Sequence, residues 1–385
     1  MARKRYRRSG ALVLYWQDGE LVFENYALRT RTGAEPLVCL ILHYCGEWRK
    51  AAAVASHLGN YDEASVRRTL DRLCKTGVLE RSDQKRDPRI AAMERWAAWN
   101  PAAGFFHFST KDTEFAEDQA AAFAELKRRS RNDPMPLARK DYPAGRRVKL
   151  PRVRAEGEFA AVLKARRTWR KYGREAVSLE TLSQILELTF GIQGWVDVPG
   201  LGRAAMKTSP SGGGLHPIEA YVLAQRVNGL KAGIYHYNGE RHELERLRSG
   251  VTRQALERSL GHQWWFTRGA FLVLMSAAFG RTQWKYDSAR AYRVVLAEAG
   301  HLCQTFCLTS TWLGLAPFCT MALTDTTWEK WLGIDGVRES IVYVAGAGTR
   351  PSKGDLKDAN ILKAGKVTRL GGSWLEAGAA RSGTA

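Results

Sequence analysis

An almost purely apolar run, FLVLMSAAF at residues 271–279, constrains the fold more than any other stretch of the sequence. Successive side chains of a strand point to opposite faces, so such a run predicts a strand that is buried on both faces. A second buried strand is expected at SIVYVAGAG, residues 340–348. Between the two strands, Asp287 is expected to be the N-cap of a long helix that ends near Leu313, just before Gly314. This arrangement predicts a sheet with helices packed on it.

Residues 161–350 are expected to form one large domain in which strands and helices alternate irregularly. SLETLSQILELTFG begins with Ser178 as a helix N-cap and stops at Gly191. IEAYVLAQRV predicts a strand, and IYHYNGERHELERL predicts a hairpin that turns at Asn238-Gly239. No internal repeat is visible in this segment. The expected fold class is therefore α+β.

Residues 1–82 predict a separate, winged-helix-like unit. A hairpin is expected around Asp18-Gly19, followed by three helical patterns at 35–45, 50–58 and 62–80, with Gly77 as the last C-cap. Winged helices bind DNA, but similar small folds also clamp extended peptides at a sheet edge. The third helical pattern opens with two acidic residues, which argues against nucleic acid. We therefore expect a peptide-binding module.

Residues 83–160 predict a mixed linker region, and residues 351–385 a flexible tail. The linker region holds an aromatic cluster, which either packs the first unit against the large domain or lines a groove, and packing is favoured. Its second part, 133–153, has four prolines and no periodicity, as in a linker or a surface arm. The clustered aromatic residues are Trp96, Trp99, Phe105, Phe106 and Phe108.

The charge of the chain is basic and uneven. The formal net charge is +20, and residues 127–174 hold 17 Lys/Arg against four acids, a balance of 17 − 4 = +13. Such a basic run is typical of a solvated connector, or it attracts an anionic partner: a nucleic acid, a flavin phosphate or an acidic peptide. The apolar run after the basic N-terminus ends at Gln17, too early for a signal peptide or a membrane span. We expect a cytoplasmic protein that does not enter a membrane.

The cysteines do not predict a metal site. Six are present, without a Cys-x-x-Cys pair. Cys303 and Cys307 stand one helical turn apart, but no matching His/Cys pair follows with zinc-finger spacing. The sequence offers no third metal ligand to accompany His216 and His301. Buried, reduced thiols are the expectation.

Three separate segments have the composition of parts of a phosphate and ring site. Residues 166–170, Arg-Arg-Thr-Trp-Arg, suit a phosphate because guanidinium groups form paired, charge-assisted hydrogen bonds. SPSGGGLHP, residues 209–217, has three consecutive glycines that allow unusual dihedrals or close approach to a ligand. AGAGTR, residues 345–350, again joins glycine to arginine. No Gly-Lys-Ser/Thr follows the glycines, so a nucleoside triphosphate site is not supported.

In this order, and together with WKYDSARAYR and LAEAGHLCQ, these segments resemble the nitroreductase-like flavoproteins. The likeness covers about residues 160–350 and is strongest to the SagB-type dehydrogenases, which are FMN-dependent azoline oxidases of peptide biosynthesis. Thr168 departs from the commoner serine, and the turn at Gly213-Gly214 is richer in glycine than usual. Neither departure removes a hydrogen-bond donor.

The resemblance implies a nitroreductase-like α+β homodimer with FMN at the subunit interface. It further implies an azoline-containing precursor peptide as substrate, a leader bound by the N-terminal module, and a possible cyclodehydratase complex. The cofactor-binding residues that it implies are Arg166, Arg167, Thr168, Arg170, Ser209, Pro210, Ser211, Gly212, Gly213, Gln304, Gly314, Leu315, Gly346, Gly348 and Arg350.

The same resemblance implies that Lys285 and Tyr286 are catalytic. Oxidation of an azoline removes a proton from one carbon and a hydride equivalent from the next, which a flavin can accept. Lys285, expected at a strand end and partly shielded from water, would be the base, and Tyr286 would polarise the ring nitrogen. Taken without the resemblance, QWKYDSAR favours an ordinary strand end, with Lys285 reaching solvent and Tyr286 packed under the helix. An NAD(P)H-dependent nitro or quinone reductase, or a flavin oxidase with another substrate, is the alternative function.

Overall fold

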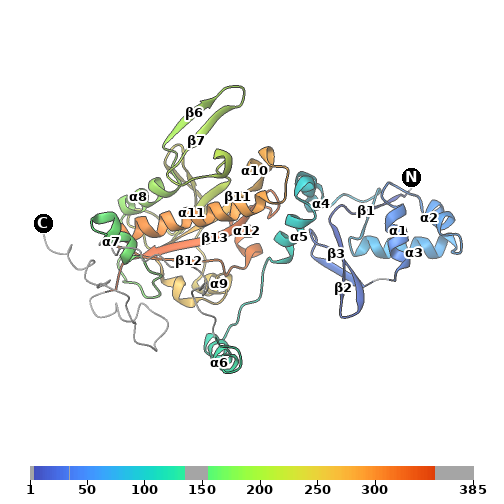
Figure 1. Ribbon diagram of the computed structural model, residues 1–385, viewed down its shortest axis with the longest axis horizontal. Coiled ribbons are helices and arrows are strands. Elements are labelled where there is room, and N and C mark those ends of the chain that lie inside the picture. The colour runs from blue at the N-terminus through green and yellow to red at the C-terminus, as the bar shows by residue number, and fades with distance from the viewer. Residues whose placement is uncertain (1–3, 34, 135–154, 352–385) are drawn as a thin grey trace, which may run out of the picture.

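A six-stranded antiparallel sheet forms the centre of the large domain, as the computed structural model of residues 4–33, 35–134 and 155–351 shows (Figure 1). The strand order is β10-β9-β8-β11-β13-β12. The two predicted buried strands, β11 and β13, are neighbours, and Val273 pairs with Ala345. The bounds are β8 Ile218–Ala224, β9 Gly233–Asn238, β10 Glu243–Ser249, β11 Phe271–Ala278, β12 Ala316–Thr320 and β13 Glu339–Gly348.

Strand β11 is buried on both faces, which confirms the first sequence prediction. Val273 and Met275 belong to a core shared with helices α8 (Leu179–Phe190) and α11 (Ala291–Trp312). Leu272 and Leu274 point to the other face, where a second core includes α9 (Arg253–Ser259) and α12 (Asp325–Leu332). The alternation of a strand thus supplies two cores from one segment. The fold is α+β, as expected.

Several predicted element ends are confirmed. The Ser178 hydroxyl accepts a hydrogen bond from the backbone N–H of Thr181 at 3.1 Å, as an N-cap does. Strands β9 and β10 form the expected hairpin after Asn238. At the end of α11, Gly314 has a φ of 77°, and the N–H of Leu315 donates to the carbonyl of Ser310 at 2.8 Å. This is the left-handed helix ending that glycine permits.

The junction after β11 differs from its prediction. A short helix, α10 (Phe279–Lys285), follows the strand, so Lys285 is a helix C-terminal residue and not a strand end. Helix α11 begins at Ala291 with Arg290 as N-cap, so the prediction of Asp287 as N-cap was wrong. The seven residues of α10 include Gly280 and lack a repeating apolar face, which is why the sequence pattern did not indicate a helix.

The first unit has the predicted hairpin, three helices and short strand. Asp18 and Gly19 both have positive φ, 51° and 83°, as the tightest hairpin turns require. The unit has its own apolar core, and the order is compatible with a winged helix, which stays a prediction. Its elements are β1 Tyr6–Arg8, β2 Leu12–Gln17, β3 Glu20–Asn25, β4 Thr30–Gly33, α1 Leu37–Tyr44, α2 Ala51–Leu58, α3 Glu63–Lys75 and β5 Leu79–Arg81.

The aromatic segment packs the two units together, as expected. Trp96, Trp99 and Phe108 are buried in the core of the large domain, which also takes in Tyr26 of the first unit. The Trp96 indole donates to the carbonyl of Val337 at 3.0 Å. Figure 1 shows this segment between the N-terminal unit and the sheet. Its helices are α4 Pro88–Ala92, η1 Met93–Trp99 and α5 Ala102–Ser109.

The sequence did not indicate several other elements. The most prominent is the hairpin β6–β7 (Gly194–Val198 and Gly202–Met206), which projects from the large domain in Figure 1. Helices α6 (Gln119–Arg129) and α7 (Glu158–Ala165) were also missed. Most of the proline-rich stretch at 133–153 and nearly all of the predicted tail at 351–385 lie outside the described residues. No helix in the described ranges is long and apolar enough to cross a membrane.

Candidate active site

The glycine loop of residues 209–217 is fixed to helix α11 by hydroxyl groups. Ser209 and Thr305 share a hydrogen bond of 2.7 Å between their hydroxyls. The Ser211 hydroxyl donates to Glu298 Oε2 at 2.6 Å and accepts from the backbone N–H of His216 at 2.9 Å. Glu298 is buried, and burial raises the pKa of its carboxyl. The loop is therefore anchored at both of its serines.

Lys285 and Tyr286 both reach this loop. A side-chain carbon built on Gly213 would lie 2.6 Å from Tyr286 Oη and 3.0 Å from Lys285 Nζ. The φ of Gly213 is 72°, so glycine is required there both for its dihedral and for the space it leaves. The Trp99 indole donates to the carbonyl of Tyr286 at 2.9 Å, which fixes the backbone of the pair. The structure thus brings together two of the segments that the sequence singled out.

A second group of predicted residues lies at the end of α11 and beside β12. The backbone N–H of Trp169 donates to the carbonyl of Pro317 at 2.9 Å. The Arg350 guanidinium donates to the carbonyls of Leu315 (3.1 Å) and Thr311 (2.9 Å), and lies 5.9 Å from the ring centre of Trp169. The first and third segments of the predicted phosphate site are therefore neighbours.

These arginines are partly buried and repel one another. Burial and the positive charge of Arg167 lower the pKa of Arg350. Burial also lowers the pKa of Arg170, whose Nε is buried without a hydrogen-bond partner among the described residues. An unpaired buried donor such as this Nε is unfavourable until an acceptor joins it. The arrangement fits a phosphate group.

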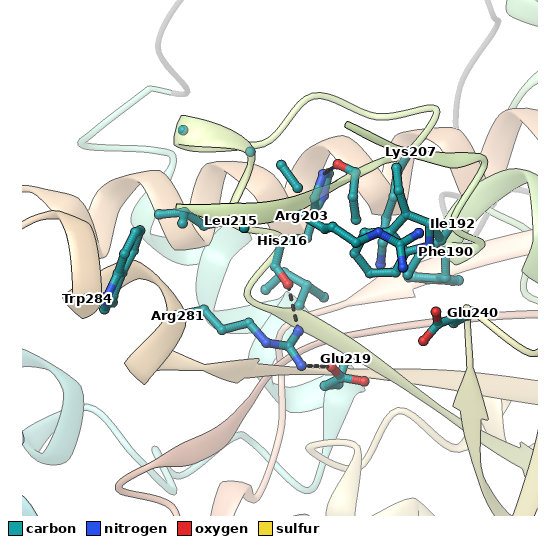
Figure 2. A pocket seen from close by; sticks show the side chains of 18 of the residues that line it. Phe190, Ile192, Arg203, Lys207, Leu215, His216, Glu219, Glu240, Arg281 and Trp284 are labelled. Carbon is teal, nitrogen blue, oxygen red and sulfur yellow. Dashed lines mark hydrogen bonds and ion pairs between the residues drawn. The ribbon is translucent and has the colours of Figure 1, made fainter. Parts of the chain in front are cut away.

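Lys285 and Gly213 border a cavity of about 1020 Å³. The hairpin β6–β7, the glycine loop, helix α10 and strands β8 and β9 enclose it, and Figure 2 shows Trp284, Leu215 and Arg281 along one side. This volume is at the upper end of small-molecule sites, so it admits a five-membered ring with flanking peptide. Lys285 and Trp284 are exposed in the isolated chain.

Charged side chains line the floor of this cavity. Arg281 donates to the carbonyl of His216 at 2.7 Å and forms an ion pair with Glu219 (Figure 2). His236 lies 2.9 Å from both Glu219 and Glu245, and its hydrogen bond with Glu219 raises its pKa to about 9. Burial opposes ionisation of Glu219, but hydrogen bonds from His236 and Arg281 lower its pKa to about 2. The floor therefore carries fixed charges of both signs.

Comparisons with known proteins agree with this geometry. Residues 163–349 match the model described as "Nitroreductase family". The chain is 31% identical to "Putative nitroreductase MJ1384" of Methanocaldococcus jannaschii over 178 residues, which cover 46% of this chain and 85% of that protein. The chain belongs to the nitroreductase family.

Two other relatives of this nitroreductase-family chain are named as processing proteins. "Trifolitoxin-processing protein TfxB" of Rhizobium leguminosarum bv. trifolii is 28% identical over 43% of this chain and 45% of its own length. "Microcin B17-processing protein McbC" of Escherichia coli is 31% identical over 33% and 48%. This chain thus matches about half the length of each. A solved chain of the "E. coli Microcin synthetase McbBCD complex with truncated pro-MccB17 bound" has a TM-score of 0.39 at 21% identity, covering 61% of this chain and 96% of that one.

The other predicted residues of the nitroreductase-family domain lie around the two groups. Gln304 is exposed on α11 next to Thr305, and Gly314 and Leu315 end that helix beside Arg350. Gly346 and Gly348 are buried in β13, where a side chain would meet Phe318 and Tyr172 respectively, so packing accounts for both glycines. The remaining predicted residues are Arg166 and Thr168, which are half-buried, and Pro210 and Gly212, which border a small groove with α11.

Sequence reasoning missed three polar residues of the site. Lys207 stands two residues before the glycine loop and lines the cavity, and burial lowers its pKa. Glu298 holds Ser211, and Arg281 holds Glu219. Glu298 occurs inside the LAEAGH motif, so that motif was a signal for it. Nothing in the sequence marks Lys207 or Arg281, because their role depends on contacts between distant segments.

Proposed function

We propose that this chain oxidises thiazoline or oxazoline rings to thiazoles or oxazoles in a ribosomally made peptide, with FMN as cofactor. The observation that carries the proposal is the convergence of Lys285 and Tyr286 on Gly213 at the border of the large cavity. The names of the two peptide-processing relatives support a peptide substrate. The four-part division of the chain, with residues 1–82 as leader-binding module, belongs to the same proposal.

The residues present fit FMN. Arg166, Arg167, Arg170 and Arg350 would hold the phosphate, since the buried Nε of Arg170 has no acceptor among the described residues. Ser209–Gly213 and the turn at Gly314-Leu315 would border the ring and ribityl chain. When bound, FMN supplies an acceptor for the hydride equivalent that leaves the azoline.

The chain's own residues handle the proton. Azoline oxidation breaks two C–H bonds, and one hydrogen leaves as a proton from the carbon next to the ring nitrogen. The Lys285 amine takes this proton as the general base. The Tyr286 hydroxyl donates a hydrogen bond to the ring nitrogen. Trp99 keeps the backbone of Tyr286 in place through its indole N–H.

The direct test measures the loss of two hydrogens from an azoline peptide by mass spectrometry. We expect Lys285→Ala and Tyr286→Phe to lower the rate by about 10²- to 10⁴-fold, the usual contribution of a positioned acid or base. Lys330→Ala, which changes an exposed lysine on α12, is the matched control and should keep the wild-type rate. Wild-type rates in Lys285→Ala and Tyr286→Phe with full flavin content would contradict the proposal.

A pair of glycine variants tests the geometry itself. Gly213 and Gly214 have nearly the same φ, 72° and 69°, but only at Gly213 would a methyl group meet Lys285 and Tyr286. Both Ala variants should lose about 1 kcal/mol of stability from backbone strain. Only Gly213→Ala should also lose oxidation activity, because its methyl displaces the two side-chain ends. Equal activity in the two variants would show that the pair does not work against this loop.

A nitro or quinone reductase is the second candidate, because the relative with the greatest coverage of its own length is named as a nitroreductase. Such an enzyme would be reduced rapidly by NAD(P)H, whereas the proposed oxidase would be reduced by its peptide. The absorbance spectrum of the purified protein tests FMN content first, and stopped-flow reduction by each donor then separates the reductase from the oxidase.

The homodimer and the cyclodehydratase complex are further parts of the proposal. Light scattering tests the homodimer, and co-purification tests the complex.

A further inference from the structure

Three cysteines from the consecutive elements α11 and β12 converge in the large domain. Cys303 and Cys307 lie one turn apart on α11, and Cys319 lies on β12. Their three sulfur atoms are all within 4.8 Å of one another. Cys303 and Cys307 are 4% and 3% exposed, so the cluster is closed on the α11 side. The sequence analysis expected buried, reduced thiols and did not place Cys319 beside Cys303 and Cys307.

The surroundings of this thiol cluster (Cys303, Cys307 and Cys319) are polar. Tyr343 Oη donates a hydrogen bond to Cys319 Sγ at 3.8 Å. The positive charge of Arg166 acts on both Cys307 and Cys319. Thiolate is the form of cysteine that binds metals.

We propose that Cys303, Cys307 and Cys319 bind a zinc ion. Tetrahedral zinc holds sulfur at about 2.3 Å, which places two ligand sulfurs roughly 3.8 Å apart. The observed sulfurs reach this spacing by shifts of about 1 Å or less. Three thiolates, Zn²⁺ and the guanidinium of Arg166 sum to zero charge, which suits a largely buried site.

A disulfide accounts for the cluster less well. It would join two of the sulfurs and leave the third thiol in a polar, cationic setting without a role. Zinc would use all three sulfurs as ligands, and a water molecule would complete the fourth position. The hydrogen bond from the Tyr343 hydroxyl would help to orient the Cys319 sulfur. Strand β12 is a short edge strand paired to β13 alone in the described sheet. The ion would therefore tie this edge strand to α11, next to Arg166.

The test is cobalt titration of the full chain after reduction and removal of bound metal. Cobalt in a thiolate site gives a sulfur-to-metal charge-transfer band, so one equivalent should produce this band in the wild type, and zinc should abolish it. Cys319→Ser should lose most of the band. Cys39→Ser, which changes a cysteine of α1 outside the cluster, should keep it. No band in the wild type, or an equal band in Cys319→Ser, would overturn the proposal.

A second measurement needs no variant. X-ray absorption at the zinc edge of the zinc-loaded wild type should show about three sulfur neighbours at about 2.3 Å and one lighter atom. A shell of nitrogen and oxygen alone would indicate zinc at surface histidines or carboxylates and would refute the cysteine site. Both measurements are independent of azoline oxidation, so the zinc site and the proposed function can fail separately.

Discussion

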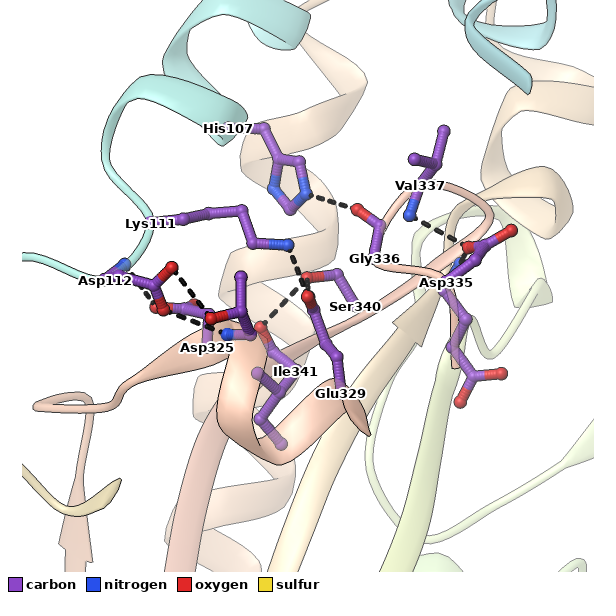
Figure 3. A network of polar contacts seen from close by, with 12 residues as sticks. His107, Lys111, Asp112, Asp325, Glu329, Asp335, Gly336, Val337, Ser340 and Ile341 are labelled. Carbon is purple, nitrogen blue, oxygen red and sulfur yellow. Dashed lines mark hydrogen bonds and ion pairs between the residues drawn. The ribbon is translucent and has the colours of Figure 1, made fainter. Parts of the chain in front are cut away.

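Two groups of charged side chains in the described chain differ in kind, the network of Figure 3 and the residues around the cavity of Figure 2. In the first, Lys111 Nζ donates to both oxygens of Glu329, at 2.5 and 2.7 Å, and the two side chains are only 5% and 7% exposed. The Ser340 hydroxyl also donates to Glu329. In the second, Lys207 is half-buried and has no ion pair or hydrogen bond with the described residues.

This difference separates a structural network from one that is open to a ligand. His107 completes the first network between Tyr292 Oη (2.9 Å) and the carbonyl of Gly336 (3.1 Å), and none of these residues lines the cavity of Figure 2. It ties residues 102–112 to α12 and β13, which helps to hold the neighbouring Trp99 against Tyr286. The cavity network, by contrast, gives Lys207 only the longer-range charges of Glu219 and Glu298, and no direct ion pair among the described residues, where a substrate can approach.

The largest effect should come from breaking the closed network. Lys111→Met leaves a buried carboxylate without its counter-charge, so we expect a loss of about 3–5 kcal/mol in the free energy of unfolding. Urea denaturation followed by fluorescence measures it. The double variant Lys111→Met with Glu329→Met removes both charges and should recover most of that loss. A single variant within about 1 kcal/mol of wild type would mean that the pair is not buried in solution.

The closed network also shows where sequence-based prediction stops. Ser178, Asp18-Gly19 and the run at 271–279 were interpreted correctly, because caps, turns and apolar alternation are local signals. Lys111 and Glu329 are 218 residues apart, and neither has a local pattern that marks it as buried. The same holds for Cys319 and Lys207. The proximity of Lys285 and Tyr286 to the glycine loop was expected only through a family resemblance, since spacing alone cannot bring residues 213 and 285 together.

An intermediate effect should appear at His236, whose two carboxylate partners belong to the open network. Its pKa is raised to about 9, so the protonated ring stabilises the fold fully below its ordinary pKa of about 6.5. This stability is lost as pH rises through about 9. Since the side chain is 24% exposed, we expect a contribution of only about 1–2 kcal/mol.

The measurement for His236 is urea unfolding at several pH values. The free energy of unfolding of the wild type should fall by about 1–2 kcal/mol between about pH 6.5 and 9. That of His236→Gln should vary less over the same interval. His43→Gln, a change at an exposed histidine of α1, is the control and should follow the wild-type curve. Parallel curves for wild type and His236→Gln would show that the carboxylates do not hold the ring as described.

The smallest effect, and the sharpest contrast, should come from repeating the Lys→Met change at Lys207. Burial lowers the pKa of this lysine, so the folded chain disfavours its charge, and methionine removes that cost. We expect the free energy of unfolding of Lys207→Met at neutral pH to equal that of the wild type or to exceed it by up to about 1 kcal/mol. The unfolded wild-type chain binds more protons at this residue than the folded chain, so wild-type stability rises with pH and the advantage of Lys207→Met shrinks towards pH 10. A loss near that of Lys111→Met would mean that Lys207 has a structural partner and that the cavity network is closed as well.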